Sequence, residues 1–179
     1  MNSLFPHIRT KSAYDIPYGR LRADGFRGII FDIDNTLVPH GAPADAKAVE
    51  LFRRLSGMGF ELSLISNNGD DRVRPFAEAV RAYYVTKAGK PRRRGFIDAM
   101  RMMGTTTSDT LQIGDQIFTD IWGGRRTGLF SVLVDPIDPT KETPFIYFKR
   151  VLEKPVLFAY RIRQMWVRPR IKKMRENRQ

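Results

Sequence analysis

The sequence predicts an α/β protein: a three-layer, Rossmann-like parallel sheet with helices on both faces. Short apolar runs rich in β-branched residues recur along the chain, and a segment with helical spacing of apolar residues separates each run from the next. Strands that alternate with helices form parallel sheets with right-handed crossovers, and strands buried on both faces are apolar throughout. The expected strands cover residues 27–32, 60–66, 83–86, 110–114 and 129–134.

The expected helices lie between these strands and have recognisable end signals. Asp45 can cap a helix that carries Leu51 and Leu55 on one face and ends near Gly57. Pro91 suits the first turn of a later helix, because its missing N–H is not needed there. The other expected helices cover about residues 70–80, 91–103 and 117–126, and residues 12–22 form a short helix or an extended lead-in.

The composition is that of a globular protein without disulfide bonds. The chain has 179 residues, 42% of them hydrophobic, which is enough for one domain with a core. It has no cysteine, which excludes disulfides and thiolate metal sites. Residues 1–15 lack the apolar core of a signal peptide, and no apolar run approaches the ~20 residues of a membrane span. We therefore expect a cytoplasmic protein, either free or peripheral on the inner face of the membrane.

The positive charge is concentrated near the C-terminus. The whole chain has a net charge of +12, but residues 144–179 contain 11 Lys and Arg against two Glu. That segment therefore has a net charge of +9, and the preceding 143 residues have only +3. Such asymmetry indicates a polyanionic partner, either nucleic acid or an anionic membrane. We predict a catalytic domain at residues 1–143 and a basic, amphipathic helical tail at residues 144–179.

Polar side chains with catalytic potential follow four of the expected strands. They are Asp32, Asp34 and Thr36 after the first strand, Ser66 and Asn67 after the second, Lys90 after the third, and Asp115 and Asp120 after the fourth. Each taken alone suits an ordinary turn or helix start. However, the carboxyl ends of parallel strands meet at one edge of the sheet, where α/β proteins bind ligands. Neighbouring carboxylates there repel each other and need a cation or a catalytic role, so the set as a whole predicts a catalytic site.

The same residues resemble the motifs of a known superfamily. The set Asp32-x-Asp34-Asn-Thr36, Ser66-Asn-Asn, Lys90-Pro91 and Gly114-Asp115-Gln-x-x-Thr-Asp120 resembles the four motifs of the haloacid dehalogenase-like phosphatases. The longer runs around these motifs resemble the YqeG branch and the related phosphatidylglycerophosphate phosphatases. The resemblance covers roughly residues 12–137, and no signature is recognised beyond residue 143.

The resemblance implies a mechanism and a metal. Asp32 would attack phosphorus and form an aspartyl-phosphate, and Asp34 would act as general acid and then as general base. Mg²⁺ would be held by the Asp32 carboxylate, the Asp34 backbone carbonyl and Asp115. Zinc is not expected, because cysteine is absent and the chain has only two histidines, one of which, His40, follows the first motif.

The resemblance also implies how the phosphate is bound. Thr36, Ser66 and Asn67 would bind the substrate. Lys90 would neutralise charge that develops during transfer, and Asp120 would orient Lys90 or a metal-bound water. Lys87 is an alternative to Lys90, since the two lie in one loop. We prefer Lys90, because Lys-Pro followed by Gly95-Phe96 matches the helix entry of the family.

The spacing of the motifs leaves no room for a cap domain over the site. Asp32 and Ser66 are 34 residues apart, and Ser66 and Lys90 are 24 apart, so helices and strands of the sheet fill both gaps. An open site suits a bulky substrate, and by resemblance we favour phosphatidylglycerophosphate at a membrane surface. The alternatives are a phosphatase of nucleic-acid ends, nucleotides or another soluble phosphate ester, or a non-catalytic binding module.

The tail combines basic with apolar residues. Aromatic and aliphatic side chains alternate with Lys and Arg from residue 145 to Trp166, a pattern typical of membrane-surface segments. We predict docking on an anionic membrane; nucleic-acid binding is less favoured, and the apolar residues up to Tyr160 could instead pack on the sheet. Pro155 and Pro169 are expected to break the tail into two or three short helices.

Overall fold

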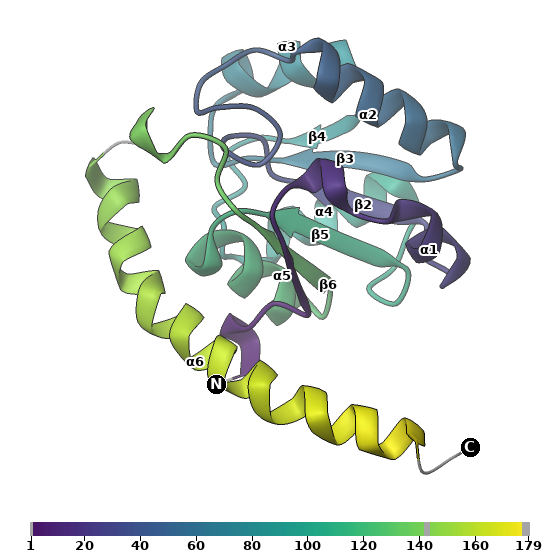
Figure 1. Cartoon of the computed structure of the whole chain (residues 1–179). Coiled ribbons are helices and arrows are strands. Elements are labelled where there is room, and N and C mark those ends of the chain that lie inside the picture. The colour runs from purple at the N-terminus through teal and green to yellow at the C-terminus, as the bar shows by residue number, and fades with distance from the viewer. Residues whose placement is uncertain (1, 142–143, 177–179) are drawn as a thin grey trace.

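The computed structural model describes residues 2–141 and 144–176 and shows a six-stranded parallel sheet covered by helices (Figure 1). The strand order is β1-β6-β5-β2-β3-β4, and every paired neighbour is parallel. The strands are β1 (Ile8–Thr10), β2 (Gly28–Phe31), β3 (Glu61–Ile65), β4 (Tyr83–Val85), β5 (Thr110–Gly114) and β6 (Phe130–Val134). The predicted α/β fold is therefore confirmed, and five of the strands lie where the sequence places them.

The edge strand β1 was not predicted. It has only three residues, and Ile8, its apolar residue, is 43% exposed. It pairs with β6, where Ile8 lies opposite Val132, so a distant segment of the chain defines it as a strand. A three-residue run has too little periodicity to be recognised without that partner.

The helices form two layers around the sheet. They are α1 (Tyr18–Ala23), α2 (Ala46–Gly57), α3 (Asp70–Val80), α4 (Arg93–Met103), α5 (Trp122–Thr127) and α6 (Pro144–Glu176), with short turns η1 (Asn2–Leu4), η2 (Ala13–Asp15), η3 (Ile117–Ile121) and η4 (Pro139–Lys141). Asp45 caps α2 as predicted, since its carboxylate accepts the N–H of Ala48 at 2.7 Å.

The central strand β2 provides the core on both faces of the sheet. All four of its residues are buried. Ile29 and Phe31 belong to the cluster that includes α1, α2 and α3, whereas Ile30 packs with Phe96 of α4 on the opposite face. Each fully buried side chain of this size stabilises the fold by about 1.5–3 kcal/mol, so this alternation fixes the register of β2 and the position of the residues that follow it.

The edge of the sheet is open between the motif strands. The chain between β2 and β3 forms α2 and its loops, and the chain between β3 and β4 forms α3. All residues of these two segments are described, and neither segment contains a cap domain. The predicted absence of a cap over these strands agrees with the structure.

Helix α6 is continuous over 33 residues, so the prediction that prolines break it is wrong. It runs along one side of the domain and past it (Figure 1). Glu153 is buried before Pro155, and Val156, Leu157 and Tyr160 pack on the domain after it. These contacts on both sides offset the hydrogen bond that Pro155 cannot donate. None of the helices in the described ranges combines the length and apolar character needed to cross a membrane.

Candidate active site

The predicted site residues meet at the carboxyl ends of three neighbouring strands, β5, β2 and β3. Phe31 of β2 lies opposite Ile113 of β5, and Asp32 and Asp115 follow just beyond this pair. Ser66 follows β3 on the other side of β2. The parallel register therefore brings together residues that are far apart in the sequence.

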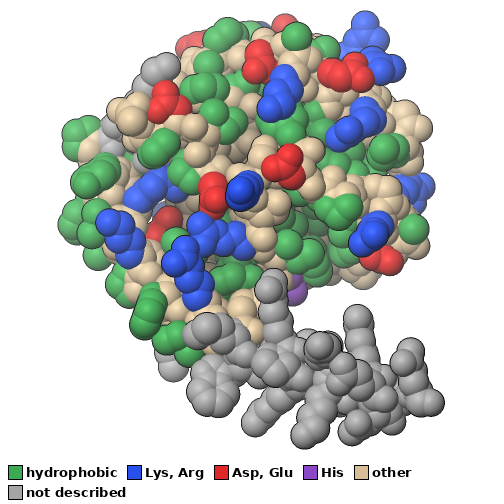
Figure 2. All heavy atoms as spheres, in the orientation of Figure 1, with side chains coloured by type: hydrophobic (Ala, Val, Ile, Leu, Met, Phe, Trp, Pro, Cys, Tyr) green, Lys and Arg blue, Asp and Glu red, His purple; other side chains and the backbone are tan. Residues whose placement is uncertain are grey.

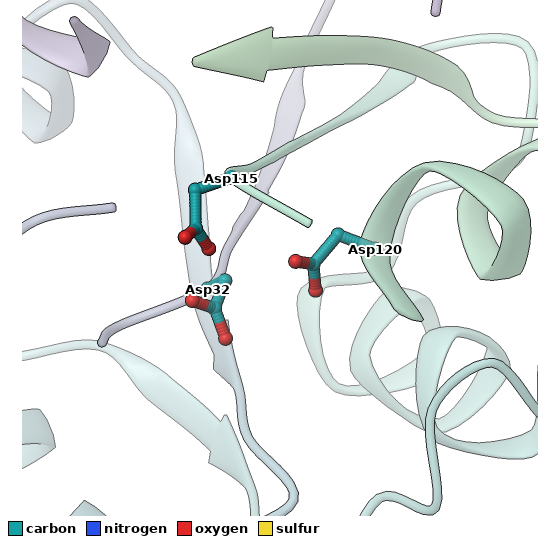
Figure 3. Close-up of side chains that lie close together, drawn as sticks. All are labelled: Asp32, Asp115 and Asp120. Carbon is teal, nitrogen blue, oxygen red and sulfur yellow. The ribbon is translucent and has the colours of Figure 1, made fainter. Parts of the chain in front are cut away.

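Three buried carboxylates form the centre of the site. Asp32, Asp115 and Asp120 are 7%, 2% and 1% exposed, and one oxygen from each lies within 4.8 Å of the others. Figure 3 shows the three side chains directed toward a common space. Burial raises the pKa of Asp32 well above its ordinary value and that of Asp115 to about 7, so the cations nearby do not fully offset the cost of burying these charges.

Lys90 connects two of these carboxylates. Its Nζ donates to Oδ1 of Asp32 at 2.5 Å, to Oδ1 of Asp120 at 2.6 Å and to the carbonyl of Ile65 at 3.2 Å. Burial lowers the pKa of Lys90, but the two carboxylates outweigh burial and raise it, so the ammonium stays charged. Lys87 is exposed, and the geometry therefore favours Lys90 as the lysine of the site.

Asp120 reaches Lys90 because the chain at Gly114 lacks a side chain. A Cβ at Gly114 would lie 2.5 Å from Cβ of Asp120, which is closer than real contacts allow. Oδ2 of Asp120 accepts the N–H of Gln116 at 3.1 Å, which fixes the carboxylate on the turn η3. Asp120 thus contacts Lys90, and its predicted role of orienting Lys90 or a metal-bound water stays a prediction.

Thr36 lies against the carboxylates beneath the opening of the site. Its Oγ1 is 3.2 Å from Oδ2 of Asp32 and 3.3 Å from Oδ1 of Asp115, and the residue is 1% exposed. Asn35 turns the chain with a φ of 64°, a left-handed conformation that asparagine tolerates better than most residues. Thr36 therefore lies between the two acids and can donate its one hydroxyl hydrogen to either, and its contact with substrate stays a prediction.

Asp34 has surroundings unlike those of Asp32. Its carboxylate accepts the N–H of Gly41 at 2.8 Å, Nδ2 of Asn68 at 2.7 Å and a guanidinium N–H of Arg72 at 3.0 Å. The carboxylate thus lies outside the central cluster, and the Asp34 backbone carbonyl as a metal ligand stays a prediction. Asn68 belongs to the Ser66-Asn-Asn motif of the sequence, whereas Arg72 was not indicated, because its role depends on a contact through space.

Ser66 and Asn67 occupy the loop after β3. Oγ of Ser66 accepts the N–H of Asn68 at 3.1 Å. Oδ1 of Asn67 accepts the N–H of Lys90 at 2.7 Å, and its Nδ2 donates to the carbonyl of Lys90 at 3.3 Å. Both polar ends of the Asn67 amide thus hold the backbone that carries Lys90. Their predicted binding of substrate remains a prediction.

A cavity of about 250 Å³ opens above the carboxylates. Its lining comes from four loops and α6: Asp32, Asp34, His40, Ser66, Asn67, Asn68, Lys90, Gln116, Thr119, Ile146 and Lys149. His40 lies 4.0 Å from Asp34. A larger hollow of about 460 Å³ lies at the amino ends of β3 and β4, away from the carboxylate cluster. The smaller cavity is therefore the candidate active site, because it lies at the carboxylates.

Two charged residues of α6 contact the site, and the sequence did not indicate them. Arg150 donates to the carbonyl of Asp115 at 3.1 Å and forms an ion pair with its Oδ2. Oε1 of Glu153 accepts the N–H groups of Ile117 at 2.6 Å and Phe118 at 3.3 Å. A count of net charge cannot distinguish these inward residues from the basic residues around them. The boundary predicted at residue 143 stays a prediction, but α6 takes part in the site.

The donor set fits a hard divalent cation. The clustered side chains offer carboxylate oxygens, which Mg²⁺ prefers, and the raised pKa values of Asp32 and Asp115 indicate a need for positive charge. All three carboxylates also contact a cationic side chain of the protein, Lys90 or Arg150, so the choice of Asp32 and Asp115 as metal ligands stays a prediction.

Comparisons with known proteins agree with this site. Residues 87–136 match the family model described as HAD-hydrolase-like. The chain is 34% identical over 155 residues to "Probable phosphatase YqeG" of Bacillus subtilis (strain 168), covering 86% of this chain and 90% of that protein. It is 29% identical to "Phosphatidylglycerophosphate phosphatase 1, chloroplastic/mitochondrial" of Arabidopsis thaliana, covering 80% of this chain but 44% of that protein.

Solved structures support the fold. The crystal structure of an uncharacterized protein from Listeria monocytogenes serotype 4b has a TM-score of 0.52 and 14% identity, covering 66% of this chain and 85% of that one. The sheet, the strand-end carboxylates and these similarities define a phosphatase of the haloacid dehalogenase-like class. Within this class, the chain belongs to the YqeG family, which confirms the resemblance predicted from the motifs.

Proposed function

We propose that this phosphatase hydrolyses a phospholipid monoester, phosphatidylglycerophosphate, at a membrane surface, with Mg²⁺ and an aspartyl-phosphate on Asp32. The observation that carries the proposal is the arrangement of two carboxylates around one open cavity. Asp32 lies buried among acids and Lys90, while Asp34 lies nearer the opening with three hydrogen-bond donors. Lys90 and a bound cation would keep the Asp32 carboxylate ionised for attack, and the position of Asp34 at the opening would let it exchange a proton with the leaving group and with water.

In the first step, an oxygen of Asp32 attacks phosphorus as the bond from phosphorus to the leaving oxygen breaks. Asp34 gives its proton to that oxygen, so the alcohol leaves neutral. Lys90 and Thr36 hold the two oxygens of Asp32 and fix its direction of attack.

In the second step, Asp34 takes a proton from a water molecule that attacks the phosphorus of the aspartyl-phosphate. The bond from phosphorus to Asp32 breaks, and the carboxylate and inorganic phosphate are released. Lys90 stays charged throughout because Asp120 pairs with it even while Asp32 is esterified. The alternation of Asp34 between acid and base restores the starting state.

Asp32, Asp115 and the backbone carbonyl of Asp34 would hold the Mg²⁺. The ion, when bound, would neutralise the repulsion between these acids and a phosphate dianion. The residues around it have their own part in this arrangement. Thr36 holds Asp32 and Asp115 together, and Arg150 fixes the outer oxygen of Asp115.

The surroundings of the cavity support a lipid substrate. Helix α6 borders the cavity with Ile146 and Lys149, and its outward face exposes large hydrophobic side chains over four turns: Tyr147, Phe148, Val151, Leu152, Phe158 and Ile162. Figure 2 shows hydrophobic side chains along the edge where α6 runs, with Lys and Arg beside them. Apolar residues next to basic ones suit an anionic membrane, because each basic residue near its surface contributes about 1 kcal/mol to the free energy of binding.

The name of the Arabidopsis relative supports the same substrate class. Nucleic-acid ends and nucleotides remain the alternative substrates, and they account for the basic residues of the tail but not for the exposed apolar face. The proposed location is therefore cytoplasmic and peripheral, at the inner face of the membrane.

Phosphate release from a panel of substrates tests the proposal. The panel contains phosphatidylglycerophosphate in vesicles, glycerol 3-phosphate, a nucleoside 5′-monophosphate and a 5′-phosphorylated oligonucleotide, each with Mg²⁺ and the full chain. We expect the highest kcat/KM on the lipid. A higher kcat/KM on the oligonucleotide or the nucleotide would reject the lipid assignment, and Asp32→Asn protein controls for contaminating phosphatases.

A further inference from the structure

The inward face of α6 contacts the active site through two charged side chains one turn apart. The side chains of Arg150 and Glu153 are 16% and 5% exposed, although they belong to a segment that is otherwise basic and largely exposed. A buried or half-buried ion pair adds little net stability, because desolvation opposes the attraction. Their burial therefore calls for a purpose other than holding the helix.

Arg150 fixes the orientation of Asp115. One guanidinium N–H donates to the backbone carbonyl of Asp115 at 3.1 Å, and another pairs with Oδ2 of its carboxylate. Oδ1 of the same carboxylate lies 3.3 Å from the hydroxyl of Thr36. The planar guanidinium sets direction as well as charge, which an ammonium cannot do. Both oxygens of Asp115 thus have a fixed partner.

Glu153 holds the turn that follows Asp115. Its carboxylate accepts the N–H groups of Ile117 and Phe118 at the start of η3. The same turn carries Asp120, whose carboxylate holds Lys90. A single turn of α6 thus contacts the chain at Asp115 and again two to three residues later.

Apolar contacts already hold α6 on the domain without these two residues. Val156 and Leu157 pack against Ile117, Ile121 and Leu133. The ring of Tyr160 lies 5.9 Å from that of Phe5. Docking of the helix and orientation of Asp115 are therefore separable, so substitution can distinguish them.

We propose that Arg150 and Glu153 are positioning residues that set Asp115 for Mg²⁺ binding, so that α6 completes the metal site. This inference rests on the proposed use of Mg²⁺. One oxygen of Asp115 faces the cluster and the other is held by Arg150, which is the arrangement in which an outer partner directs a ligand. Glu153 keeps the turn from moving Asp115 away.

Mg²⁺ titration of the full-length protein tests the proposal, by calorimetry and by the rise of Tm with Mg²⁺. Arg150→Gln should weaken Mg²⁺ binding about 10–100-fold, as expected for loss of an outer partner, while the apolar contacts of α6 should keep the variant folded. Arg150→Lys keeps the positive charge but lacks the planar guanidinium. Its affinity for Mg²⁺ should therefore lie between those of the wild type and Arg150→Gln. Glu153→Ala should weaken binding by a smaller factor.

Arg161→Gln is the matched control, because it removes an exposed arginine from the same helix and should leave Mg²⁺ binding unchanged. Activity on glycerol 3-phosphate should recover in Arg150→Gln at high Mg²⁺, which a merely unfolded site could not do. Wild-type affinity in both Arg150 variants overturns the inference and leaves the proposed function standing. A wild-type protein that binds no Mg²⁺ overturns the proposed cofactor and this inference together. Should Arg150→Gln fail to fold, the Mg²⁺ affinity of Arg150→Lys decides: wild-type affinity overturns the inference, and weaker binding supports it.

Discussion

The floor and the rim of the cavity give their carboxylates different surroundings, although Asp32 and Asp34 are close in the sequence. The floor consists of Asp32, Thr36, Lys90, Asp115 and Asp120, and the rim of Asp34, His40, Asn68, Arg72 and Lys149. On the floor, burial removes water from the charged carboxylates and raises the pKa of Asp32 and Asp115, and the neighbouring acids raise it further. On the rim, one carboxylate is surrounded by donors from three segments.

The difference teaches how one strand end can supply two kinds of acid. Asp32 follows β2 directly and stays in the protein interior, whereas the turn at Asn35 leaves Asp34 at the mouth of the cavity. A group on the floor has no solvent to replace a lost partner, and a group on the rim does. Substitutions on the floor should therefore abolish the reaction, and those on the rim should slow it.

The largest effect is expected for Asp32→Asn on the floor. The amide has nearly the shape of the carboxylate but cannot attack phosphorus, so phosphate release should fall to background. Acid quenching of the wild type with labelled substrate should trap a protein-bound acyl-phosphate, and the variant should trap none. Circular dichroism controls for the fold, and turnover by pure, folded Asp32→Asn protein would contradict the role of nucleophile.

Removal of the metal should have the next largest effect. A chelator should abolish activity and Mg²⁺ should restore it, because the acids on the floor need a cation. Asp115→Asn should raise the half-saturating Mg²⁺ concentration by more than about tenfold or remove activity. Asp98→Asn, at a half-buried acid of α4 outside the site, is the control. Full activity after exhaustive chelation would show that the floor works without a metal.

On the rim, Asp34→Asn should reduce kcat by about 10²–10⁴-fold, the usual contribution of a general acid–base group. The loss should be larger for glycerol 3-phosphate than for p-nitrophenyl phosphate, since nitrophenolate leaves without a proton. Measurement of kcat for both esters separates the role of acid from a general disturbance of the cavity. An equal loss of kcat for both esters would contradict the role of Asp34 as general acid, and with it the distinction between floor and rim.

The smallest effects are expected beyond the rim, on the outward face of α6. Leu152→Ser and Phe158→Ser should each weaken binding to anionic vesicles about tenfold, because less apolar surface enters the membrane. Met102→Ser, at an exposed methionine of α4, is the control. Co-flotation at low and high salt gives the affinities, and kcat on a soluble ester should not change. Unaltered flotation of both α6 variants would exclude this face as the contact.

Point substitutions are needed for that experiment because removal of residues 144–179 would also remove Arg150 and Glu153. Buried Glu153 and Tyr160 show that α6 covers part of the domain. A truncated chain would therefore lose membrane affinity and a part of its active site together, and the two effects could not be separated.

The sequence was sufficient for the parts of the molecule that depend on local pattern. The run from Gly28 to Phe31 is apolar because β2 is buried on both faces, and the residues after it are polar because they leave the sheet. The strand ends of a parallel sheet meet, so the order of motifs alone brought Asp32, Ser66, Lys90 and Asp115 together. Both features, the burial of a strand and the meeting of strand ends, depend only on the residues of each strand and the few that follow it.

Features that depend on distant contacts could not be predicted. Strand β1 exists through its pairing with β6, and α6 passes Pro155 because buried side chains hold it on both sides. Arg150 and Glu153 were counted as charges of a tail, since only the path of α6 shows that they face inward. Arg72 was missed for the same reason.

The pairing of β1 with β6 also determines when the sheet can be completed during synthesis of the chain. The N–H of Ser131 donates to the ring of His7, 124 residues away. Closing so long a loop is slow, because its entropy is lost before the contact forms. A chain emerging from the ribosome therefore carries β1 without its partner until β6 is made, and the active site lacks Arg150 for longer still. The three acids of the cluster are all present once residue 120 is made, but under the proposed role of Arg150 the metal site would be complete only after α6 is made.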